Sequence, residues 1–171
     1  MKQHLHYFQR LLLATVMILN YVVVYADNIE IDGICYSVRR LAIETYDIAV
    51  TNKDGGYSGD IVIPQTINYD GKERQVTSID YRCFSGCKEL TSVKIPDGMT
   101  SLKQDCFKDC SSLTSVIIPN SVTSLGEASF YGCSKLESVK LPVRITSLNK
   151  NCFGHCKVSK NRALPQSVTP V

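Results

Sequence analysis

Cysteine is the residue type in this 171-residue chain whose number and spacing could support chemistry. Six of the eight cysteines form Cys-x3-Cys sets, which are Cys83 with Cys87, Cys106 with Cys110 and Cys152 with Cys156. Thiolates can coordinate a metal, attack as nucleophiles or join as disulfides. Zinc sites usually combine closer cysteine pairs with histidines at defined spacings, so we predict no metal site. Two cysteines one helical turn apart can be bridged only with suitable side-chain geometry.

The cysteines recur every 23 residues, and this periodicity favours a packing role. One column contains Cys87, Cys110, Cys133 and Cys156, and the other contains Cys83, Cys106, Ser129 and Cys152. A position that accepts either Cys or Ser requires a small residue in a packed interior. We therefore expect reduced, buried thiols. One or more disulfides remain the alternative, since such bonds persist in exported proteins.

The remaining residues show no converging set of nucleophile, base and stabilising group. His155 is the one histidine after residue 26, and its nearby thiols, Cys152 and Cys156, belong to the structural columns. The glycine-rich segment 54–60 lacks the Lys-Ser/Thr pair of a phosphate-binding loop. We therefore predict that the chain is not an enzyme, has no catalytic residue and uses no cofactor.

The elements that hold these cysteines are units of 23 residues, and apolar residues recur in the same register. Residues 90–96 alternate apolar positions and end in proline, which indicates a short strand. Residues 76–79 form a second short extended segment, and Phe84, Cys87 and Leu90 have the spacing of a helical turn. The expected repeat core comprises Phe84, Cys87, Leu90, Val93, Ile95, Phe107, Cys110, Leu113, Val116, Ile118, Phe130, Cys133, Leu136, Val139 and Leu141.

The unit Leu-Thr-Ser-Val-x-Ile-Pro, followed by Thr-Ser-Leu and Phe-x-x-Cys, resembles the BspA-type leucine-rich repeat of bacterial surface proteins. The resemblance implies a leucine-rich-repeat solenoid, with short strands, short helical turns and a parallel β-sheet on one side. Four repeats would occupy 76–171, the last of them degenerate, because Ser159 and Arg162 replace apolar residues. This last unit is either a polar terminal cap or the mark of a truncated array.

Residues 27–75 are expected to form an N-terminal β capping segment before the repeats. A strand over 29–38 would close the stack, and residues 61–64 resemble the strand-plus-proline element of the repeat. Residues 67–76 should form a hairpin that turns at Asp70-Gly71, because Asp-Gly is a strong signal for a two-residue hairpin turn.

Residues 1–26 have the layout of a secretory signal peptide, with Lys2 and Arg10 before an apolar run over 11–24. That run is shorter than the roughly 20 residues that span a bilayer, which favours cleavage over membrane insertion. The whole chain has 19 basic and 16 acidic side chains, and without Lys2 and Arg10 the basic excess falls to one. This near-neutral balance gives no electrostatic attraction for nucleic acid, so we predict no nucleic-acid partner. We predict an exported protein that is secreted, periplasmic or on the cell surface.

Residues between the buried strand positions should face the open side of the sheet, where repeat proteins usually place recognition. They are Ser92, Lys94, Ser115, Ile117, Ser138 and Lys140. The resemblance implies adhesion or another interaction with an extracellular protein or glycan, so we expect a binding module that uses this face. The alternative is a structural spacer, or a truncated remnant of a longer repeat protein, with no ligand of its own. These six residues would then be ordinary solvated positions.

Overall fold

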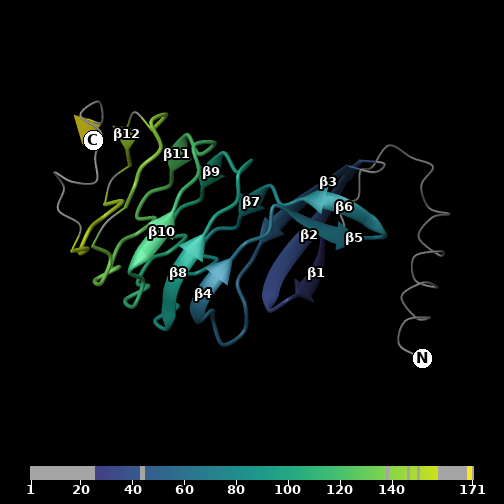
Figure 1. Cartoon of the computed structure of the whole chain (residues 1–171), viewed down its shortest axis with the longest axis horizontal. Coiled ribbons are helices and arrows are strands. Elements are labelled where there is room, and N and C mark those ends of the chain that lie inside the picture. Colours follow the sequence, from purple (N-terminus) through teal and green to yellow (C-terminus); the bar gives the residue numbers. More distant parts are fainter. Residues whose placement is uncertain are drawn as a thin grey trace.

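The structure is a computed structural model, and it describes residues 26–42, 45–137, 139–145, 147–149, 151–157 and 169–170. Residues 1–25 of the predicted signal peptide lie outside this range, as do Ser138, Ser159 and Arg162. Within the described part, short strands follow one another along an elongated body, with an N-terminal sheet at one end (Figure 1).

The N-terminal sheet contains β1 (Ala26–Ile31), β2 (Ile34–Ala42) and β3 (Thr45–Val50), paired antiparallel in chain order. The single strand expected over 29–38 is wrong, because the chain reverses within it at Asp32-Gly33. Both residues have positive φ, 50° and 78°, as a two-residue hairpin turn requires. β3 then pairs in parallel with β7 (Ser78–Ile79), which joins this sheet to the first repeat.

Two further elements connect the N-terminal sheet with the repeats. β4 (Gly59–Val62) is the strand-plus-proline element, and it pairs in parallel with β8 (Leu90–Lys94). The expected hairpin is present as β5 (Thr66–Tyr69) and β6 (Lys72–Gln75). Its turn residues, Asp70 and Gly71, both have positive φ.

The repeats place their strands in two parallel rows, which run side by side in Figure 1. One row has the order β10-β8-β4, where β10 spans Ser115–Ile117, and an isolated bridge joins Ile117 to Lys140 beyond it. The other row contains β7, β9 (Ser101–Leu102), β11 (Ser124–Leu125) and β12 (Ser147–Leu148), and β12 pairs with β13 (Thr169–Pro170). Residues 23 positions apart are direct neighbours in both rows.

Between the two rows, the chain makes successive turns, and no helix is present among the described residues. The expected helical turn at Phe84 is interrupted because Arg82 and Gly86 have positive φ, 56° and 76°, which a right-handed helix excludes. The turns bond to the next unit instead. The amide of Phe84 donates to the carbonyl of Cys106 at 2.9 Å, and that of Gly86 donates to Lys108 at 2.8 Å.

The core is a continuous column of apolar side chains along the stack. Every residue predicted for the repeat core is at most 7% exposed. Phe84, Phe107, Phe130 and Phe153 stack face to face, with ring centroids 4.9, 5.2 and 5.3 Å apart and planes within 5° of parallel. Tyr57 closes the N-terminal end of this stack, with its ring centroid 4.8 Å from that of Phe84.

Candidate binding face

The outer face of the β10-β8-β4 sheet carries a row of exposed side chains in direct register. Val62 pairs with Lys94, Lys94 with Ile117, and Ile117 with Lys140. Both lysines are exposed, and the side chains of Val62 and Ile117 are 63% and 61% exposed. We call these four residues the lysine row. It alternates apolar and cationic groups at successive strands, which are about 4.8 Å apart.

A second row of polar side chains lies two residues earlier on the same strands. It contains the carboxylate of Asp60 and the hydroxyls of Ser92 and Ser115. The hydroxyls of Thr91 and Ser92 donate to one carboxylate oxygen of Asp60 at 2.7 and 2.6 Å. The hydrogen bond from Ser92, followed by that from Thr91, lowers the pKa of Asp60. Asp60 is therefore a fixed negative charge at the N-terminal edge of this face. Ser138, the expected next member, lies outside the described residues.

The charges of Lys94 and Lys140 have no ion-pair partner within the part of the chain that the structure describes. Acidic side chains pair with other cations, for example Asp47 with Arg39 at 2.8 Å and Asp80 with Lys103 at 2.9 Å. The lysine row therefore combines two available cations with two exposed aliphatic groups. Such a surface can contact an anionic partner that also carries apolar groups.

Sequence reasoning placed Lys94, Ile117 and Lys140 on this face but missed Val62 and Asp60. Their strand falls outside the 23-residue period, because the β5–β6 hairpin separates Pro64 from Pro96 by 32 residues. The strand-plus-proline pattern of residues 61–64 was the signal that could have placed them in the row.

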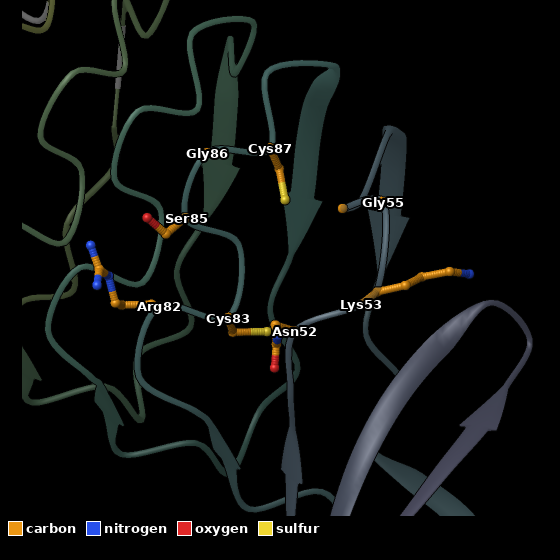
Figure 2. Close-up of a pocket in the computed structure, with 9 residues that line it drawn as sticks. Asn52, Lys53, Gly55, Arg82, Cys83, Ser85, Gly86 and Cys87 are labelled. Atoms are coloured by element: carbon orange, nitrogen blue, oxygen red, sulfur yellow. The ribbon is translucent and has the colours of Figure 1, made fainter.

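A second surface feature is an open pocket of about 480 Å³ between the 52–56 loop and the first repeat turn. Its polar lining includes Asn52, Lys53, Arg82 and Ser85. Figure 2 shows the side chains of Lys53 and Arg82 directed away from one another. The Lys53 ammonium bonds Glu30 at 2.7 Å and the Gly33 carbonyl at 3.1 Å. The charged groups around this pocket therefore do not converge on a common point.

The cysteines are packing and hydrogen-bonding groups in this structure. All eight are free thiols, and they lie within the described residues. The thiols of Cys110, Cys133 and Cys156 donate to the carbonyls of Phe84, Phe107 and Phe130, at 2.9, 3.0 and 2.9 Å. Burial raises the pKa of Cys106, and burial raises that of Cys152 to about 12. These groups are therefore protonated at neutral pH and are weak nucleophiles.

His155 does not pair with a thiol in the described structure. Its exposed ring contacts that of Tyr131 edge-on, with centroids 4.9 Å apart. The Cys156 thiol is engaged by the Phe130 carbonyl instead. Over the described residues, no group of three or more His, Cys, Asp or Glu side chains has the arrangement of a metal site.

Stacked 23-residue units with two rows of short parallel strands define a leucine-rich-repeat protein. The profile of the BspA type leucine-rich repeat region matches residues 64–171, in six copies. The chain belongs to this family, which confirms the resemblance seen in the sequence. The match begins before residue 76, where we placed the first of four units. No curated protein matches the chain.

Solved structures show the same fold. A leucine-rich repeat protein from Bacteroides ovatus has a TM-score of 0.64 at 24% identity, over 90% of this chain and 37% of its own. A leucine-rich cell surface protein from Faecalibacterium prausnitzii has a TM-score of 0.60 at 24% identity, over 84% and 44%. A third, from Bacteroides capillosus, has a TM-score of 0.65 at 19% identity, over 84% and 98%. The chain thus spans less than half the length of the first two.

The described residues contain no helix long and apolar enough to cross a membrane.

Proposed function

We propose that this chain is an exported, non-catalytic binding module that recognises an extracellular protein or glycan through the outer face of the β10-β8-β4 sheet. The observation that carries the proposal is the lysine row, in which Lys94 and Lys140 lack ion-pair partners among the described residues and flank an Ile117 side chain that is 61% exposed. Exposed apolar groups in register with available cations favour contact with a partner.

Two further observations support export and surface recognition. The N-terminal sequence has the layout of a signal peptide. One structural neighbour is itself described as a leucine-rich cell surface protein. Adhesion is the form of binding that suits an exported module of this family.

The test is binding of the purified chain to an array of extracellular-matrix proteins and glycans, with the double variant Lys94→Glu/Lys140→Glu beside the wild type. We expect the wild type to bind at least one array member and the double variant to lose most of that signal, because the reversed charges repel an anionic partner. Lys88→Glu is the matched control, since Lys88 is an exposed lysine in the turn before β8. It should leave binding unchanged.

Two results would contradict the proposal. Binding that survives the double variant would place the partner on another surface. A folded wild type that binds nothing on the array would favour a structural spacer, with the lysine row as ordinary solvated surface.

A further inference from the structure

We propose that the lysine row binds an acidic peptide segment in the polyproline II conformation, with a carboxylate at every third residue, lying across the strands. This inference rests on the proposed function and names the partner class for the same face. Three properties of the row carry it: the spacing of its cations, the pairing of its strands and the position of its apolar groups.

The spacing of the lysines matches a three-residue repeat. Lys94 and Lys140 are separated by the strand of Ile117, so they lie two strand steps apart, which is roughly 10 Å. A polyproline II helix rises about 3.1 Å per residue with three residues per turn, so equivalent side chains recur every ~9.3 Å on one side. In a β-strand, same-side residues recur every ~6.7 Å, which would bring only one carboxylate onto a lysine.

The pairing of the strands excludes a partner that must bond to the sheet backbone. β8 is paired with β4 on one side and with β10 on the other, so the backbone groups at the centre of the row are already used in the ladders. A polyproline II segment needs no backbone hydrogen bonds, and its ordering cost is low because the conformation is preformed. An α-helix needs a broader apolar stripe than Val62 and Ile117 provide.

The apolar groups favour a peptide over a sulfated polysaccharide. Ile117 lies between the two lysines, and Val62 lies on the other side of Lys94. In a Glu-Pro-Pro repeat the carboxylates recur on one side of the helix and can reach both lysines, while the prolines lie on its other two sides. The aliphatic part of the glutamate side chains is then the group that contacts Ile117. A densely charged glycan would place hydrated groups against the same exposed apolar area, without compensation.

The negative charge of Asp60 disfavours an acidic partner at the β4 end of the lysine row. It lies two residues from Val62 on β4, on the side of the row away from Lys140. Its carboxylate is held by Thr91 and Ser92 and is not paired with Lys94 in the described structure. The peptide therefore lies mainly over β8 and β10 and reaches β4 at Val62, and Asp60→Asn should tighten binding by about twofold through the loss of one screened repulsion.

The experiment is an NMR titration of the purified chain with two peptides of identical composition. One contains three Glu-Pro-Pro repeats, and the other contains three Glu residues followed by six Pro residues. We expect the spaced peptide to bind several-fold tighter and to shift resonances of β4, β8 and β10. Lys94→Gln and Lys140→Gln should each weaken it by about twofold to fivefold, the range measured for exposed ion pairs. Ile117→Ser should weaken it too, and Lys88→Gln should not.

Equal affinity for the two peptides would overturn the inference, because spacing would then not matter. Tighter binding of an α-helical peptide with acids seven residues apart would overturn it as well. Heparin is a third ligand, and binding of heparin that depends on Lys94 and Lys140, with no peptide binding, would assign the face to a sulfated glycan. In that case the proposed function stands and this inference fails. A face that binds neither these ligands nor any array member contradicts both.

Discussion

At the scale of single residues, Cys110, Cys133 and Cys156 are both small apolar groups and hydrogen-bond donors. The Cys133 thiol, fully buried, donates to the Phe107 carbonyl at 3.0 Å, and Cys110 makes the equivalent bond to Phe84. In the first unit, Cys87 has a different role, because its sulfur accepts from the amide of Tyr57 at 3.2 Å. At each interface between units, a thiol thus adds a second hydrogen bond to a carbonyl that also accepts from a backbone amide.

We expect Cys133→Ala to lower the free energy of unfolding by about 1–2 kcal/mol, because it removes one of the two hydrogen bonds that the Phe107 carbonyl accepts and opens a small cavity. The other bond, from the Cys110 amide at 3.3 Å, remains. Cys133→Ser keeps a donor and should cost less. Urea unfolding monitored by circular dichroism measures both.

The matched control is Cys106→Ser, in the column where Ser129 occurs naturally and donates to the Gly126 carbonyl. It should cost less than Cys133→Ala. Equal stability of Cys133→Ala and wild type would show that the thiol bond contributes nothing.

The burial of these thiols could be predicted from the sequence, but their bonding could not. Burial follows from the fixed period of both cysteine columns, one of which also accepts Ser. Donation depends on where the preceding unit places the carbonyl of Phe84 or Phe107, and that position follows from a turn geometry that the residue types do not specify.

At the scale of elements, two columns of left-handed residues shape each turn. One column contains Arg82, Asp105, Ala128 and Asn151, with φ between 52° and 58°. The other contains Gly86, Asp109, Gly132 and His155. These residues point alternate amides toward the next unit, as in the bond from Asp109 to the Tyr131 carbonyl at 2.7 Å. The turn segments therefore form a hydrogen-bonded ladder of their own.

Ala128→Gly should stabilise the protein by up to about 1 kcal/mol, because alanine at φ 52° carries a steric cost that glycine does not have. Thermal unfolding of the variant checks this. Ala42→Gly, at an exposed strand position of β2, is the control and should be neutral or destabilising. If both variants lose stability equally, the left-handed conformation at Ala128 stores no strain.

The same columns explain why the strands of the repeats were predicted well and the turns were not. Strand positions repeat Leu, Val, Ile and Pro, whereas the left-handed column holds Arg82, Asp105 and Ala128, which share no chemical property. The sequence also does not indicate that residue 126 must be glycine, because Lys103 and Asn149 occupy the equivalent positions of the neighbouring units. A Cβ on Gly126 would lie 2.6 Å from the carbonyl carbon of Lys103, a contact visible only in three dimensions.

At the scale of the whole molecule, the N-terminal sheet continues the stack. β3 extends the row of β7, and Tyr57 extends the phenylalanine stack. An ion network crosses the junction: Arg39 contacts Asp47 at 2.8 Å and Asp80 at 3.6 Å, and Lys103 contacts Asp80 at 2.9 Å. The candidate face crosses the junction as well, since Val62 and Asp60 come from the segment before the repeats. The period of the repeat could predict the part of the face after residue 76, whereas Val62 and Asp60 lie before the 23-residue register begins.

The buried thiols act together on the stability of the whole molecule at alkaline pH. Burial raises the pKa of Cys83 and of Cys106 above the ordinary value of 9.0, and that of Cys152 to about 12. Above pH 9, the unfolded chain releases these protons while the folded chain keeps them. The folded state then binds more protons, so its stability must fall as pH rises.

We therefore expect the urea midpoint to be steady from pH 7 to about pH 8.5 and to decrease steadily from about pH 9 toward pH 12. Tyr36 adds to the decrease above pH 10, because burial raises its pKa from 10.0 to about 12. Cys106→Ser removes one titrating group, so its midpoint should fall less steeply than that of the wild type over the same range. A wild-type midpoint that stays constant up to pH 10.5 would mean that the thiols ionise as easily in the folded chain as in the unfolded chain. The cysteine columns would then be accessible to water, contrary to their burial in the structure.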